Sequence, residues 1–240
     1  MNYQSFSSYA SMSRAAAAMI ADILRAKPEC VLGLATGSSP IGTYDELVRM
    51  HREEGLSFAH CTTINLDEYL GLDGAHPQSY RFFMNEHLFS RVDIRLDHTF
   101  VPCGTASDPA AECLAYDARL KALGGADIQL LGIGPDGHIG FNEPADSFTV
   151  ATHVVDLAPS TINANARFFD SAAEVPRQAL TMGMGGIMAA KKILLIAPGS
   201  SKKAVLDAAM TGPVTPRLPA SLLQLHPDVT VFFEEGPTSP

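Results

Sequence analysis

The chain has 240 residues and a formal net charge of −9, from 17 basic and 26 acidic side chains. This negative charge argues against sequence-independent binding of nucleic acid, which needs a basic face. The length suits one large domain with its own core, and only 18% of the residues are charged, below the roughly 25% of ordinary soluble proteins, so much of the chain is interior.

Helical and strand-like segments alternate along the chain. Apolar residues at helical spacing predict helices, and the short apolar runs between them predict buried strands. The predicted helices cover 11–26, 40–54, 77–88 and 108–123, and the predicted strands cover 30–35, 61–65, 99–102, 127–132, 193–197 and 229–233. Such alternation favours right-handed crossovers. We therefore predict an α/β fold with an open, mostly parallel β-sheet flanked by helices on both faces, a Rossmann-like three-layer sandwich.

No linker rich in Ser, Pro or Gly divides the sequence, so we expect a single domain over residues 1–240. The stretch 152–184 is polar with weak periodicity and is a candidate for a mobile lid. The four cysteines form no C-x-x-C pair, and Cys30 and Cys61 each begin an apolar run, which predicts buried thiols rather than disulfides. The apolar runs are shorter than the roughly 18 residues that span a bilayer, so we expect a soluble, cytoplasmic protein without a membrane partner.

The segment after the first predicted strand is a candidate phosphate seat. It consists of Thr36, Gly37, Ser38, Ser39 and Pro40. Proline is common in the first turn of a helix, and a helix N-terminus offers backbone N–H groups and the positive end of the helix dipole to an anion. The spacing is not that of a P-loop, and Ser39 is equally interpretable as an ordinary N-cap.

Two adjacent carboxylates, Asp67 and Glu68, follow the strand predicted at 61–65. Consecutive side chains of an extended chain point to opposite sides, so one carboxylate can face a cleft while the other holds a loop. Taken alone, the pair is more simply interpreted as a solvated turn.

The segment after the strand predicted at 127–132 combines glycines, which allow close approach of a ligand, with Asp136, His138 and Glu143. A histidine oriented by a carboxylate can accept and donate protons near neutral pH. These residues therefore predict an acid–base site. A metal site is less favoured, because one histidine with two carboxylates lacks a second histidine. The G-x-S-x-G sequence of serine hydrolases is missing.

Two basic residues complete the candidate site. Lys202 follows a predicted strand and a glycine turn, where it can meet an anion at the edge of the sheet, and Arg167 lies in the polar stretch before it. The alternative for either residue is a solvated surface cation.

Together these motifs resemble the glucosamine-6-phosphate deaminase family, over about residues 31–233. The segments that carry the resemblance are 34–40, 66–72, 76–80, 136–144 and 223–227. Their Asp-Gly-His sequence is shared with 6-phosphogluconolactonase relatives. The Phe-Asn-Glu-Pro sequence that follows it and the Asp-Glu-Tyr segment point to the deaminase branch.

The resemblance implies conversion of glucosamine 6-phosphate and water to fructose 6-phosphate and ammonia, in the catabolism of N-acetylglucosamine, without a cofactor or metal. It makes Asp67 the base that moves a proton between C2 and C1 of the sugar. It assigns ring opening to His138, oriented by Asp136 and Glu143. The phosphate contacts that it implies are Thr36, Gly37, Ser38, Ser39, Arg167 and Lys202.

Two departures from the family pattern stand out. Pro135 precedes Asp136 where a polar residue is usual. Allosteric members bind N-acetylglucosamine 6-phosphate at a subunit interface through Arg and Lys, where this chain has His153 and Val155, and they carry a C-terminal helical extension. We therefore expect the short, non-allosteric type, a monomer whose partner is a small sugar phosphate.

Three alternatives remain open at this stage. A galactosamine-6-phosphate deaminase/isomerase or a 6-phosphogluconolactonase would use the same phosphate seat, and no residue in the sequence reports the contact to C4 of the sugar. The lactonase needs no base at C2, so a requirement for Asp67 would separate it. A sugar-phosphate sensor domain belongs to another class, and such sensors carry a basic DNA-binding segment that this chain lacks.

Overall fold

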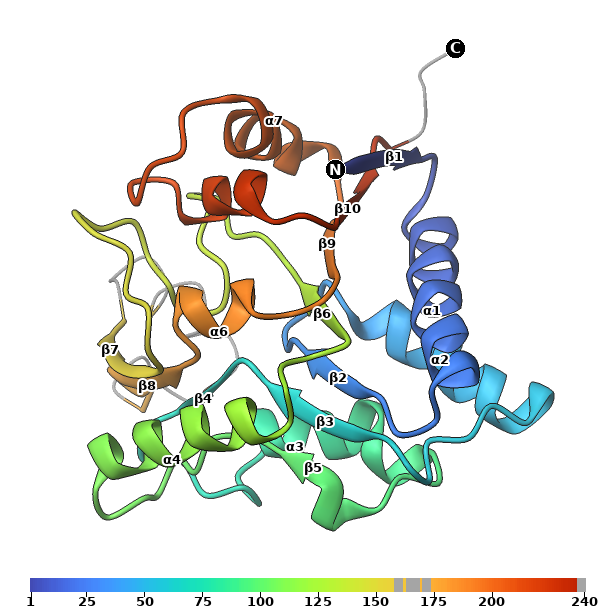
Figure 1. Ribbon diagram of the computed structural model, residues 1–240, viewed down its shortest axis with the longest axis horizontal. Helices are drawn as coiled ribbons and strands as arrows, with labels where there is room; N and C mark the ends of the chain where they lie inside the picture. The colour runs from blue at the N-terminus through green and yellow to red at the C-terminus, as the bar shows by residue number, and fades with distance from the viewer. Residues whose placement is uncertain (158–161, 163–168, 170–173, 237–240) are drawn as a thin grey trace.

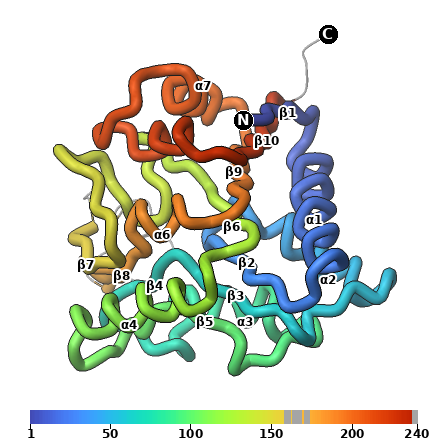
Figure 2. The backbone as a smooth tube through the Cα atoms, viewed as in Figure 1, coloured from blue at the N-terminus to red at the C-terminus, as the bar shows by residue number. Residues whose placement is uncertain are grey.

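The computed structural model describes residues 1–157, 162, 169 and 174–236. Seven strands of this part of the chain form one sheet whose neighbours all pair in parallel. In sheet order they are β1 (Asn2–Phe6), β10 (Val229–Glu234), β9 (Ile193–Ala197), β6 (Ile128–Leu131), β2 (Val31–Leu34), β3 (Thr62–Asn65) and β5 (Thr99–Phe100). The N-terminal strand lies beside β10 at one edge (Figure 2). The prediction of an open parallel sheet is confirmed.

Helices cover both faces of this sheet, α1 and α2 on one side and α4 and α6 on the other (Figure 1). The α-helices are α1 (Tyr9–Ala26), α2 (Ile41–Glu54), α3 (Tyr80–His87), α4 (Pro109–Ala122), α6 (Met184–Met188) and α7 (Lys203–Thr211). The 3-10 segments are η1 (Phe89–Arg91), η2 (Leu96–His98), η4 (Ser200–Lys202) and η5 (Pro219–Leu225). One core lies under α1, α2 and α3, and the second lies under α4, α6, α7 and η5. These are the three layers that the sequence predicts.

A second, smaller sheet lies beside the first and was not predicted. It is antiparallel and consists of β4 (Asp67–Tyr69), β8 (Gln178–Thr181) and β7 (His153–Asp156). Its strands β7 and β8 come from the two ends of the stretch 152–184. Most of the residues between these strands lie outside the described residues, so the mobile lid stays a prediction.

Capping explains the largest shift in a predicted helix boundary. We expected a helix from residue 77, but α3 begins at Tyr80. Ser79 is extended, and its hydroxyl accepts a hydrogen bond of 3.0 Å from the Phe82 N–H, which is the geometry of an N-cap. The caps of α1 act in the same way, since Ser8 accepts from the Ser11 N–H and the helix starts at Tyr9, two residues before the predicted start.

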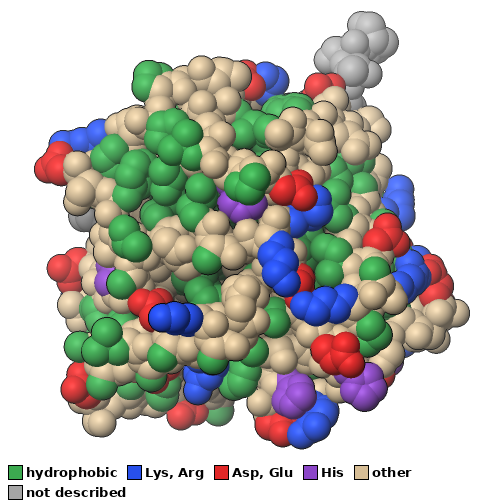
Figure 3. Space-filling model, in the orientation of Figure 1, with side chains coloured by type: hydrophobic (Ala, Val, Ile, Leu, Met, Phe, Trp, Pro, Cys, Tyr) green, Lys and Arg blue, Asp and Glu red, His purple; other side chains and the backbone are tan. Residues whose placement is uncertain are grey.

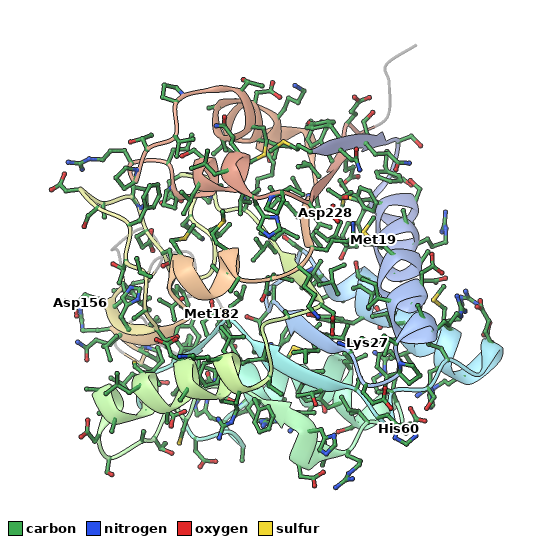
Figure 4. All side chains as sticks on the ribbon, in the orientation of Figure 1. Met19, Lys27, His60, Asp156, Met182 and Asp228 are labelled. Carbon is green, nitrogen blue, oxygen red and sulfur yellow. The ribbon has the colours of Figure 1, made fainter. Side chains whose placement is uncertain are left out.

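All four cysteines are free thiols, and Cys30 and Cys61 are buried as expected. None of the described helices combines the length and the apolar character that crossing a membrane requires. On the face shown in Figure 3, acidic and basic side chains are interspersed rather than gathered by sign. One such group lies at the N-terminal ends of the strands, where Asp127 accepts from Lys27 (labelled in Figure 4) at 2.8 Å and from Lys191 at 2.7 Å.

Candidate active site

The predicted site residues that the structure describes gather at the carboxyl ends of neighbouring strands. The loops after β2, β3, β6 and β9 carry the candidate phosphate seat, Asp67, the Asp136–His138–Glu143 group and Lys202 respectively. Because these strands are adjacent in the order β9-β6-β2-β3, their loops meet at one edge of the sheet. This edge is where open α/β sheets bind their ligands.

The loop after β6 brings its three ionisable side chains together. His138 Nδ1 lies 2.7 Å from Asp136 Oδ1 and 3.7 Å from Glu143 Oε2. The hydrogen bond to His138 holds the pKa of the Asp136 carboxyl well below its usual range. With the Nδ1 proton donated to Asp136, His138 Nε2 is the nitrogen that can exchange a proton with a substrate. The imidazole also packs directly on Gly134, where a β carbon would lie 2.2 Å from the ring.

Contacts on two sides hold this loop, and sequence reasoning did not find the residues that make them. On one side, the Ala220 N–H of η5 donates to the Gly137 carbonyl at 2.9 Å. On the other, the Phe141 N–H donates to Thr181 Oγ1 at 3.1 Å, and Asn142 Nδ2 donates to the Met182 carbonyl at 2.9 Å. Met182 (labelled in Figure 4) directly follows β8. The smaller sheet therefore positions the His138 loop that follows β6 of the larger one.

Asp67 lies beneath the same loop. It is the first residue of β4, is only 5% exposed and pairs across the strands with Thr181. Gly140 has a φ of +59°, and a β carbon there would stand only 3.3 Å from Asp67 Oδ2, so a glycine suits the close passage of the loop over Asp67. Burial raises the pKa of the Asp67 carboxyl to about 8, and the neighbouring charge of Glu68 adds to this effect. A carboxyl with this pKa takes up and releases a proton near neutral pH, as a general base must.

The raised pKa of Asp67 makes the stability of the fold depend on pH. An unfolded aspartate ionises at about 3.8, whereas the folded Asp67 ionises at about 8, so the folded state binds the extra proton between these values. The resulting stabilisation is complete below the lower value and is lost as pH rises through the higher one. We expect Asp67→Asn to gain stability relative to the wild type from pH 5 to pH 9, measured by urea unfolding. A difference that stays constant over this range would contradict the raised pKa.

Glu68 points to the opposite side of the chain from Asp67 and holds a helix rather than facing the site. Its buried carboxylate accepts from the backbone N–H groups of Tyr69 at 2.8 Å, Tyr80 at 2.9 Å and Arg81 at 3.0 Å. Two of these donors belong to the first turn of α3, which has no intrahelical acceptor for them. The two carboxylates therefore divide between a buried position under the loop and a structural cap, so the simpler interpretation of the pair as a solvated turn is wrong.

Removal of this cap should destabilise the fold. In Glu68→Ala the three backbone N–H groups, one buried and two partly buried, lose their acceptor, so we expect the free energy of unfolding to fall by about 2–4 kcal/mol. The measurement is urea denaturation followed by circular dichroism. Glu86→Ala, on the exposed side of the same helix, is the matched control and should stay within about 0.5 kcal/mol of the wild type. Equal stability of the two variants would refute the capping role.

The candidate phosphate seat has no ordinary cap of its own. α2 begins at Ile41, its N-cap is Pro40, and no side chain makes a capping hydrogen bond there, so the interpretation of Ser39 as the N-cap is wrong. Gly37 has a φ of +91°, which turns the chain at the end of β2. Ser38 is exposed, Thr36 and Ser39 are partly exposed, and Ser39 lies next to Gly132 at the start of the His138 loop.

Lys202 is the last residue of η4, which lies in the loop after β9, and its side chain is half-buried. Burial lowers the pKa of its ammonium group, and the negative charge of Asp136 partly offsets this, so the two side chains belong to the same electrostatic environment. The turn before it is held by Glu234, which accepts from the Gly199 N–H at 2.9 Å. Arg167, the other predicted phosphate contact, lies outside the described residues.

Residues 5–232 match the model of the family described as glucosamine-6-phosphate isomerases/6-phosphogluconolactonase. The chain belongs to this family. A glucosamine-6-phosphate deaminase of Clostridium perfringens is 54% identical over 227 residues, which cover 95% of this chain and 94% of the relative. A glucosamine-6-phosphate deaminase of Bacillus velezensis is 52% identical over 235 residues, 98% of each chain.

Solved structures agree with this membership of the glucosamine-6-phosphate isomerase/6-phosphogluconolactonase family. The structure of a monomeric glucosamine-6-phosphate deaminase superposes with a TM-score of 0.95 at 47% identity, covering 98% of this chain and 97% of the other. A 6-phosphogluconolactonase from Trypanosoma brucei superposes with a TM-score of 0.75 at 20% identity, covering 98% and 96%. The second likeness concerns the fold alone.

Among the described residues of this family member, the side chains of the His138 loop also have the composition of a cation site. Asp136, His138 and Glu143 each offer a ligand atom, and these atoms lie within 4.8 Å of one another. A cation bound to His138 Nδ1 would have to displace the proton that the nitrogen shares with Asp136. The same atoms therefore serve either a hydrogen-bonded acid–base group or a ligand set.

Proposed function

We propose that this chain is a glucosamine-6-phosphate deaminase, which converts glucosamine 6-phosphate and water to fructose 6-phosphate and ammonia. The observation that carries the proposal is the buried Asp67 carboxyl with a pKa of about 8, lying under the loop that holds the His138 group. Identity of 47–54% to deaminases over nearly the whole chain supports the same reaction. A base and a separate proton shuttle are what an aldose–ketose isomerisation needs.

The first step is opening of the sugar ring by His138. Its Nε2 accepts the proton of the O1 hydroxyl and passes it to the ring oxygen O5 as the C1–O5 bond breaks. Asp136 and Glu143 face His138 Nδ1 and stabilise the charged imidazole that forms between the two transfers. The product is the open-chain aldehyde, whose C2 proton is acidic because the adjacent carbonyl stabilises the carbanion.

Asp67 then moves a proton from C2 to C1. Its carboxylate takes the C2 proton and returns it to C1 by way of an enolamine, while a proton passes from the amino nitrogen to O1. C1 thereby becomes an alcohol carbon and C2 an imine carbon. Water adds to the imine carbon, ammonia leaves, and the ketone of fructose 6-phosphate remains. During these steps the phosphate is held at the seat of Thr36, Gly37, Ser38 and Ser39, with positive charge from Lys202 and Arg167.

Galactosamine 6-phosphate and 6-phosphogluconolactone are the alternative substrates. Hydrolysis of the lactone needs no proton transfer at C2, so that reaction would not require the buried Asp67 carboxyl as a base. The test is release of ammonia and fructose 6-phosphate from glucosamine 6-phosphate, with the other two compounds assayed in parallel. Turnover of the lactone alone would replace the deaminase with a lactonase, and turnover of none would favour a sugar-phosphate sensor.

The protein acts as a monomer without allosteric activation. Two observations support this. The chain has His153 and Val155 where allosteric members carry Arg and Lys, and it resembles a monomeric deaminase. Light scattering after size exclusion should give the mass of a single chain, 25.6 kDa. The rate should depend hyperbolically on glucosamine 6-phosphate, and N-acetylglucosamine 6-phosphate should not change that curve. A sigmoidal curve that this ligand straightens would overturn the assignment.

A further inference from the structure

The hydroxyl of a tyrosine outside the predicted site contacts both the candidate phosphate seat and the helix that follows it. The Tyr9 hydroxyl lies 3.1 Å from the Ser38 carbonyl oxygen and 3.0 Å from that of Ser39, and it accepts from the Gly42 N–H at 2.8 Å. Tyr9 is the first residue of α1, which packs against α2 (Figure 1). One hydroxyl thus joins the end of the seat to the first turn of the following helix.

We propose that Tyr9 is a positioning residue that sets the phosphate seat for anion binding; this inference rests on the proposed function. A trans peptide unit directs its C=O and N–H to opposite sides. When the Ser38 carbonyl points to Tyr9, the Ser39 N–H points the other way, toward the seat. The peptide between Ser39 and Pro40 has no N–H to offer an anion, because proline lacks one. Only its Ser39 carbonyl oxygen could face the phosphate, and it would repel it. Tyr9 holds this partly negative oxygen away from the phosphate.

Close packing of α2 on α1 fixes the position of the Tyr9 hydroxyl relative to the seat. A β carbon on Gly42 would lie 2.9 Å from Tyr9 Cε1 and 2.6 Å from Ser13 Oγ, so the start of α2 rests directly on α1. The Gly42 N–H is among the first N–H groups of α2, which lack intrahelical acceptors, and the Tyr9 hydroxyl supplies one. A residue larger than glycine at position 42 would push α2 away from Tyr9 and Ser13. The position of the phosphate seat therefore depends on the contact with Tyr9.

The test is Tyr9→Phe, which keeps the ring and removes the hydroxyl. We expect KM for glucosamine 6-phosphate and the inhibition constant of inorganic phosphate to rise together by about fivefold to tenfold, the size of one or two lost hydrogen bonds. Because the Tyr9 hydroxyl contacts residues 38, 39 and 42 at the phosphate end of the site, kcat should stay within about twofold. Tyr3→Phe, at an exposed tyrosine of β1, is the matched control and should change neither constant. A lower kcat with unchanged KM, or a lower melting temperature with unchanged KM and phosphate inhibition, would overturn the proposal.

Calorimetric titration with inorganic phosphate separates this inference from the proposed reaction. If the wild type binds phosphate but does not turn over glucosamine 6-phosphate, weaker phosphate binding by Tyr9→Phe still supports the positioning role. Unchanged phosphate binding by the variant refutes it, and so does absence of phosphate binding by the wild type. Gly42→Ala provides a second variant, since its methyl group displaces the tyrosine ring without removing the hydroxyl. It should weaken phosphate binding in the same direction, and unchanged binding would count against the proposal.

Discussion

Asp67→Asn should lower kcat for glucosamine 6-phosphate by about 10³-fold, within the range of 10²–10⁴ that a single general base contributes. The amide has nearly the shape of the carboxyl but cannot take the C2 proton. Binding of the phosphate should change little, because Asp67 is buried under the His138 loop whereas the seat lies at the end of β2. The measurement is steady-state release of ammonia, combined with inhibition by inorganic phosphate.

A pH profile adds an independent readout of the same residue. The base must be ionised in the free enzyme, so kcat/KM of the wild type should rise with pH and level off near the Asp67 pKa of about 8. Asp22→Asn, on the exposed side of α1, controls for loss of a negative charge and should match the wild type. Equal losses in kcat and in phosphate affinity in Asp67→Asn would show that the residue supports the fold of the site instead of acting as the base.

His138→Gln should lower kcat by about 10²-fold or more, because ring opening then lacks its proton shuttle. Glutamine can replace the hydrogen bond to Asp136 but cannot exchange a proton near neutral pH. The loss should change which step limits the rate. With glucosamine 6-phosphate deuterated at C2, the variant should show an isotope effect near one, because ring opening precedes cleavage of the C2–H bond.

The control for this variant is His60→Gln. His60 is exposed and is labelled in Figure 4 near the N-terminal ends of the strands, away from the His138 loop. Its substitution should leave both kcat and the isotope effect unchanged. A primary isotope effect in His138→Gln larger than that of the wild type would place His138 in cleavage of the C2–H bond. That result would contradict the assignment of ring opening to His138 and of C2 proton transfer to Asp67.

The large sheet was predictable because its signals are local. Strands such as β6 and β9 are short apolar runs buried on both faces, and the helices between them repeat apolar residues at helical spacing. The carboxyl ends of parallel strands meet at one edge, so the gathering of the candidate residues there also followed from the sequence. The order of the strands was not predictable in this way, since pairing joins segments far apart in the chain.

The second sheet lacked such signals. β4 is the three residues Asp-Glu-Tyr, and β7 is partly exposed along most of its length. These segments are strands because each pairs with β8, which lies about 110 residues beyond β4. The local sequence pattern of β4 or β7 does not predict a pairing over such a distance. The same holds for Tyr9, whose hydroxyl reaches residues 38, 39 and 42 only once α1 packs on α2.

The sequence by itself determined which chemical groups are present and to which edge of the sheet they belong, because glycine turns, charged residues and strand ends are local features. It also indicated that Asp67 and Glu68 point to opposite sides, since extended chain alternates. Only the tertiary structure decided which of the two is taken out of water and which caps a helix. Asp67 lies under Gly140 and out of water, whereas Glu68 accepts from three backbone N–H groups. Desolvation depends on what the whole fold places around a group, and that is why the pKa of Asp67 could not be predicted from its neighbours in sequence.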